Sequence, residues 1–308
     1  MNHQLVMWVV FNLVVAGMLY VDLVLANRHH HEIRLREAAV WSGVWVGVSL
    51  LFATGIYFYI GHAQALSFLT GYLIEKSLSV DNMFVFIMIF SYFGIAPAQQ
   101  PRVLKWGIIG ALVLRFVLIF VGAALVERFH WVLYLFGAVL LYSAWKMAFG
   151  EEKAFNPDEN PVFRRIKSVL PMTGLHGDHF FVKINKIWYA TPLFLALLVV
   201  EFSDVVFALD SIPAIFSITT DTFLVYTSNV FAILGLRALY FLVAGLVQMF
   251  AYLKYGVALI LAFVGVKMLL EKWVPISTGT SLSVVVGVLA VSVFLSVFLR
   301  PKLINPKS

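Results

Sequence analysis

Six carboxylates lie inside apolar stretches of this sequence, where charged side chains are rare. They are Asp22, Glu75, Asp81, Glu201, Asp204 and Asp210. Each costs about 2.5–3.5 kcal/mol at the centre of a membrane helix on an insertion scale. We therefore expect each acid to be protonated, paired with a basic residue or bound to a cation.

Four of these acids form two matching motifs, in which two acids stand six residues apart and an amide or hydroxyl residue follows. The motifs are Glu75, Asp81, Asn82 and Asp204, Asp210, Ser211, with Glu201 one turn before the second motif. Carboxylate, amide and hydroxyl oxygens suit hard divalent cations such as Mn²⁺, Mg²⁺ or Ca²⁺. We predict a metal site from these seven residues, with Asp22 as an accessory candidate.

The spacing within each motif limits its geometry. Six residues turn about 240° around a regular helix, so the two acids of a motif face different sides unless the helix breaks. Pro213 predicts such a break beside Asp210, because it has no N–H for the carbonyl of Leu209.

Basic residues within the same stretches are Lys76, Arg115 and Arg237. We expect the two arginines to balance acid charge rather than to bind an anionic substrate. The alternative is that the acids only pair with them and hold helices together. His29, His30 and His31, and the group His176, Asp178 and His179, are interpreted as solvated loop residues, with metal sensing as the alternative.

Composition indicates the elements that carry these residues. Apolar residues make up 62% of the 308 residues, charged residues 12%, and mean hydropathy is +0.93, which excludes a soluble or disordered chain. We predict an all-α polytopic membrane protein with about nine spans. The spans are expected to be helices rather than barrel strands, because apolar and polar residues do not alternate at period two. The spans are 5–26, 38–60, 66–93, 103–124, 131–149, 191–218, 222–247, 252–270 and 280–299. The first is expected to be a retained helix.

Lys and Arg predict the orientation. With the N-terminus outside and the C-terminus inside, 16 of the 22 basic residues fall on the inner side and 3 on the outer side. The chain has no Cys, which excludes disulfides and thiolate sites. Basic residues are spread over loops, so no nucleic-acid partner is expected, and no hydrolase or ATPase motif predicts an enzyme or a prosthetic group. The lipid bilayer is the expected surrounding, and the oligomeric state is not predicted.

The two motifs also belong to a longer internal repeat, in which Arg115 matches Arg237. Spans 3–5 and 6–8 would run in opposite directions, as in transporters with inverted repeats. The predicted division of the chain is a two-helix segment, a first repeat, a cytoplasmic linker, a second repeat, and a last helix with a basic tail. These cover residues 1–65, 66–149, 150–190, 191–271 and 272–308.

Three segments closely resemble the TerC family, with its Alx-type members nearest: TGYLIEKSLSVDNMFVF (70–86), EFSDVVFALDSIPAIFSITTD (201–221) and SNVFAILGLRALYF (228–241). The resemblance implies a bacterial inner-membrane protein that exports Mn²⁺, in a family first named for tellurite resistance. It places the family's motif acids on Glu75, Asp81, Asp204 and Asp210.

The residues and the resemblance together predict a secondary exporter of a divalent cation, Mn²⁺ first, in exchange for protons. One alternative is a non-transporting membrane partner that delivers metal to exported proteins or serves tellurite resistance. Another is an intramembrane enzyme acting on a lipid phosphate, which no phosphate-binding loop supports.

Overall fold

The computed structural model describes residues 3–21, 35–150, 171–173, 179–246, 253–270, 273–274 and 276–298. Asp22, the histidines at 29–31, His176 and Asp178 lie outside this range. The side chain of Asp81 also lies outside it, although its backbone is part of a helix.

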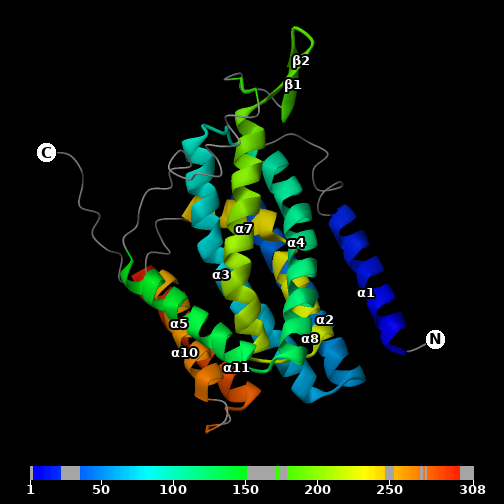
Figure 1. Cartoon of the computed structure of the whole chain (residues 1–308), viewed down its shortest axis with the longest axis vertical. Helices are drawn as coiled ribbons and strands as arrows, with labels where there is room; N and C mark the ends of the chain where they lie inside the picture. Colours follow the sequence, from blue (N-terminus) through cyan, green and yellow to red (C-terminus); the bar gives the residue numbers. More distant parts are fainter. Residues whose placement is uncertain are drawn as a thin grey trace, which may run out of the picture.

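Helices dominate the described chain and follow the predicted spans closely (Figure 1). They are α1 (His3–Tyr20), α2 (Leu35–Tyr59), α3 (His62–Tyr92), α4 (Gln100–Arg128), α5 (Val132–Phe149), α7 (Pro192–Phe216), α8 (Thr222–Ile233), α9 (Leu236–Leu246), α10 (Leu253–Leu270) and α11 (Thr278–Phe298). Among the described residues, α2, α4, α5, α7 and α11 are long and apolar enough to cross a membrane, and the bent pair α8–α9 meets the same criteria when its two helices are taken together. The fold is thus that of an all-α polytopic membrane protein, while nine spans and their orientation stay predictions.

Helices α3, α4 and α7 form the centre of the bundle (Figure 1). Gly71 of α3 lies close to Ile215 near the end of α7, whereas Met83 of α3 shares a cavity with Val200 nearer the start of α7. Residue numbers therefore rise along one helix as they fall along the other, so α3 and α7 are antiparallel. The predicted inverted repeat requires this direction, although the repeat itself stays a prediction.

The predicted span 222–247 is not one straight helix, which corrects the sequence analysis. It divides into α8 and α9, which meet at a bend of 50°. Gly235 lies at the break with a φ of +79°, a left-handed conformation that glycine adopts without strain. The ring of Trp45 from α2 lies directly against Gly235, so this position has no room for a side chain.

The predicted break at Pro213 is wrong, because α7 continues through Pro213 to Phe216. Pro213 lies in the last turn of the helix, where its missing N–H removes one hydrogen bond and little of the helix depends on it. The bend in this half of the chain is therefore in α8–α9 rather than beside Asp210.

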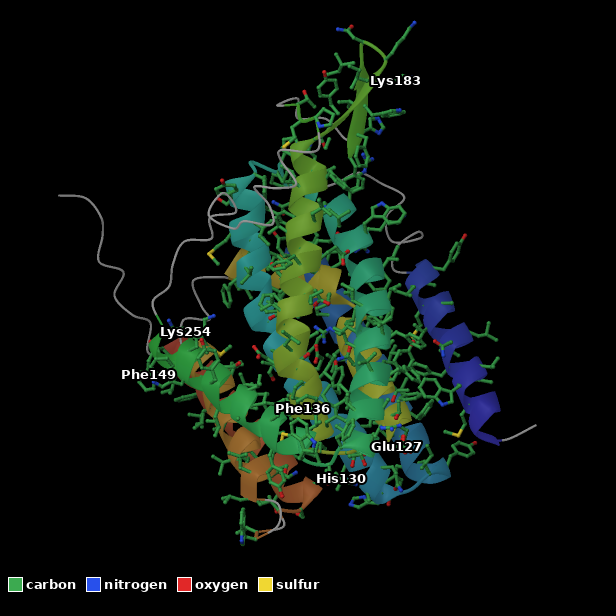
Figure 2. All side chains as sticks on the ribbon, in the orientation of Figure 1. Glu127, His130, Phe136, Phe149, Lys183 and Lys254 are labelled. Atoms are coloured by element: carbon green, nitrogen blue, oxygen red, sulfur yellow. The ribbon has the colours of Figure 1, made fainter. Side chains whose placement is uncertain are left out.

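A β-hairpin within the predicted linker was not expected from the sequence. Strand β1 (Phe181–Ile184) pairs antiparallel with β2 (Ile187–Ala190) through a two-residue turn. Both turn residues, Asn185 and Lys186, have positive φ, which matches the right-handed twist of a tight hairpin. The hairpin extends from the bundle at the start of α7, and Figure 2 shows Lys183 at that end, with Glu127 and His130 at the other.

Candidate functional site

Arg115 is the centre of a buried charged cluster between three helices. It lies in the middle of α4 and is 2% exposed. Its Nη2 donates to Asp204 Oδ1 of α7 at 3.2 Å, and its Nε donates to Asp204 Oδ2 at 3.4 Å. Its Nη1 donates to Glu75 Oε1 of α3. The same Nη1 also donates to Ser211 Oγ of α7, at 3.2 Å. One guanidinium thus ties together α3, α4 and α7.

The cluster has an excess of negative charge. It contains two buried carboxylates, Glu75 and Asp204, and one guanidinium, while the neighbouring Lys76 and Glu201 add one charge of each sign. Within the described part of the chain, Glu75 Oε2 has no hydrogen-bond partner. A buried oxygen without a partner is costly in an apolar interior. The cluster therefore has one carboxylate oxygen that is available to another donor or to a cation.

A small cavity of about 20 Å³ reaches this cluster from one side, with Asp204 in its wall. That volume is enough for one water-sized particle. Apart from Asp204 its walls are formed by Met83, Phe86, Leu104, Gly107, Ile108, Ala111, Val200 and Leu236. These residues come from α3, α4, α7 and the start of α9, so the cavity lies beside the α8–α9 bend.

Glu201 lies one turn before Asp204 on α7 and is packed against α4. A Cβ added to Gly110 of α4 would overlap its carboxylate, so the absence of a side chain at Gly110 makes room for this acid. Glu201 is partly exposed, in contrast to the buried Glu75 and Asp204.

Asp210 faces a different side of α7. Its Oδ1 accepts a hydrogen bond of 2.6 Å from Ser143 Oγ of α5. Asp204, six residues earlier, faces Arg115 on α4. The unbroken α7 thus presents the two acids of one motif to different helices, which follows from the helix geometry.

The remaining candidates are distributed over the bundle. Asn82 is buried on α3, seven residues after Glu75. Arg237 is buried in the first turn of α9, beside the bend. Among the described residues, no group of three His, Asp or Glu side chains is close enough to hold a metal ion. The structure thus brings Glu75, Asp204 and Ser211 together at Arg115 and leaves Asp210 at α5. His179, described but exposed, accepts a hydrogen bond from Thr191 Oγ1 through its carbonyl oxygen.

Sequence reasoning assigned no specific contact to several polar residues that the structure places within the bundle. Ser143, the partner of Asp210, is an ordinary serine in an apolar helix and gives no signal of its own. Lys76 donates to the carbonyl of Ala232 at the end of α8, at 3.2 Å. Asn229 is fully buried in α8, and its amide atoms have no hydrogen-bond partner in the described chain. Asn229 could have been identified from the sequence as a polar residue within the apolar segment SNVFAILGLR, which served above only to establish the family resemblance.

Comparison with known proteins agrees with this architecture. The family model "Integral membrane protein TerC family" matches residues 60–303. A protein of Salmonella typhi and one of Escherichia coli K12 are each 49% identical over 304 residues. The matches cover 96% of this chain and 94–95% of theirs. Both are named as a proposed membrane-bound redox modulator, Alx.

A membrane protein of Myxococcus xanthus without an assigned function is 47% identical over 291 residues, with 94% of this chain and 91% of that protein covered. No solved structure matches the chain. With a family match across most of its length and relatives near half identity, the chain belongs to the TerC family of integral membrane proteins.

Proposed function

We propose that this protein is a secondary transporter that exports a divalent cation, with Mn²⁺ as the favoured substrate. The observation that carries the proposal is the buried cluster of Glu75, Asp204 and Arg115, with its excess negative charge and its unpartnered Glu75 Oε2. Carboxylate and hydroxyl oxygens from two helices are ligands that a hard divalent cation prefers.

The position of the cluster supports transport rather than static binding. Its members come from three different helices, and a cavity beside a bent span reaches Asp204. The acids stand on the continuous helices α3 and α7, and the discontinuous pair α8–α9 lies beside them. Intramembrane acids close to a discontinuous helix are typical of secondary transporters, in which helices move against one another around the site. The neutral oxygen of Ser211, which shares Arg115 with the two acids, is the additional ligand we propose.

Export of a divalent cation needs an energy source. Moving two charges out of a negative interior costs about 4.6 kcal/mol at 100 mV, from about 2.3 kcal/mol per charge. Protons are the exchange ion we propose, because a carboxylate binds either a proton or a metal ion. Protonated acids would also let the apolar helices repack without unpaired charge.

The description of the relatives as redox modulators raises a second candidate. This chain contains no Cys, so it has no thiol for a direct disulfide exchange. A redox role would therefore act through the metal ion that the protein moves or delivers. In one form of this second candidate, the protein does not transport metal but binds it for delivery to another protein. The buried acids would support that role as well.

Metal flux tests the proposal. The purified protein is reconstituted into liposomes loaded with a Mn²⁺-sensitive dye, and uptake is recorded for wild type, Asp204→Asn and Asp210→Asn. Glu127→Gln is the matched control, because Glu127 is exposed at the far end of α4 (Figure 2). We expect flux in wild type and control and loss of flux in both Asp variants. Metal binding without flux in the wild type would favour the non-transporting partner.

A further inference from the structure

The N–H groups of Arg115 bind the same carboxylate and hydroxyl oxygens that would coordinate a transported cation. The guanidinium takes both oxygens of Asp204, one oxygen of Glu75 and the hydroxyl of Ser211. All four residues are buried. A metal ion that bridges Glu75 and Asp204 therefore competes directly with Arg115 for the same oxygens.

An empty carrier has an electrostatic problem that this arrangement solves. After the cation leaves, an acid that has not taken up a proton would remain charged in an apolar interior, and such an unpaired charge opposes the closing of the helices around it. Arg115 is attached to α4 and reaches both acids, which lie on α3 and α7. It can therefore neutralise part of their charge and join the three helices in the absence of substrate.

We propose that Arg115 is a tethered substitute for the transported cation, a proposal that rests on the transport function above. In the empty carrier the guanidinium holds Glu75 and Asp204 together. Binding of the divalent cation displaces it from Glu75 and Asp204, and release of the cation lets it return. Arg115, together with a proton on the acid charge that it does not balance, thereby permits the metal-free carrier to change its conformation.

Charge arithmetic gives this exchange a substrate preference. With Arg115 in place, two ionised acids and one guanidinium sum to −1, and the neighbouring Lys76 and Glu201, of opposite charge, leave this sum unchanged. A monovalent ion that displaced the guanidinium from both acids would leave their net charge at −1, whereas a divalent ion brings it to zero. The site therefore favours divalent over monovalent cations by charge as well as by its ligands.

Two transport modes separate this role from a structural one. Net flux requires the empty carrier to return, whereas exchange of labelled for unlabelled Mn²⁺ requires only the loaded carrier. Both are measured in liposomes for wild type, Arg115→Gln, Arg115→Lys and the control Arg128→Gln. Arg128 is exposed in the last turn of the same helix. Equilibrium binding of Mn²⁺ to each purified protein is measured in parallel.

We expect Arg115→Gln to lose net flux and to keep exchange, and to bind Mn²⁺ at least about tenfold more tightly because its internal competitor is gone. Arg115→Lys keeps the tethered charge and should recover part of the net flux, and Arg128→Gln should behave as wild type. Equal loss of both transport modes in folded Arg115→Gln, with unchanged affinity, would overturn the proposal.

A structure of the wild-type protein with Mn²⁺ keeps the proposal testable if Arg115→Gln does not fold. The proposal requires the guanidinium to leave Asp204 when the metal is bound, and a bound metal with the Arg115–Asp204 pair intact would contradict it. Wild-type protein that neither binds nor moves Mn²⁺ would instead contradict the proposed function.

Discussion

The carboxylate of Glu201 lies against Gly110, so the side chain of α7 occupies the space that a Cβ on α4 would need. This relationship links an acid predicted from its sequence motif to a glycine with no motif. It also fixes how closely α4 and α7 approach each other on the side of Asp204, because small residues let membrane helices pack at short distance.

Gly110→Ala should therefore displace Glu201 or separate α4 from α7. We expect a loss of about 1–3 kcal/mol in stability, as for other overpacked interiors, and reduced Mn²⁺ flux. Thermal unfolding in detergent and liposome flux measure the two effects. Gly43→Ala is the control, because a Cβ at Gly43 has nothing within 4 Å. The clash is not responsible if Gly110→Ala together with Glu201→Ala is as unstable as Gly110→Ala alone.

Ser143→Ala removes the hydroxyl that donates to Asp210 at 2.6 Å. Loss of a hydrogen bond to a partly buried carboxylate should cost about 1–3 kcal/mol. If Asp210 binds the cation, Ser143→Ala should also change the apparent affinity for Mn²⁺, but less than Asp210→Asn. Concentration-dependent flux measures this affinity. Ser283→Ala, at an exposed position on α11, is the control, and equal effects of both serine variants would exclude a specific role for Ser143.

Lys76→Met tests the contact between α3 and the end of α8. The ammonium donates to the carbonyl of Ala232 where α8 stops, a place where a positive charge also favours the helix dipole. We expect a loss of about 1–3 kcal/mol in stability and altered flux, because the carbonyl next to the α8–α9 bend loses its donor. Thermal unfolding is the first measurement. A variant as stable as the wild type would show that the contact contributes nothing to the bend.

Proton coupling predicts the direction of a pH effect. In liposomes loaded with Mn²⁺ and with the membrane potential clamped, a lower pH outside should speed Mn²⁺ efflux, because inward proton movement drives it. A protonophore should remove the acceleration. Efflux that ignores both the pH gradient and the protonophore would favour a facilitated pathway or another coupling ion.

Much of the fold could be predicted because the position of each helix depends on the hydropathy and length of its own segment of the chain. Apolar stretches near the length of a membrane span set where helices form, and the described helices begin and end within a few residues of those expected. The bend at Gly235 could not be predicted in the same way. A single glycine in an apolar run fits a straight helix equally well, and the ring of Trp45 on a distant segment is what occupies the space beside it.

The sequence by itself determined that this chain is a helical membrane protein with acids at costly positions, because hydropathy and charge are properties of each residue. Its spacing predicted that Asp204 and Asp210 face different sides of an unbroken helix, but the expected break at Pro213 left this open until the structure showed α7 to be continuous. Only the tertiary structure decided that Arg115 meets Glu75 and Asp204, and that Ser143 meets Asp210. Those partners are 40, 89 and 67 residues apart in the chain, and their meeting depends on how whole helices pack.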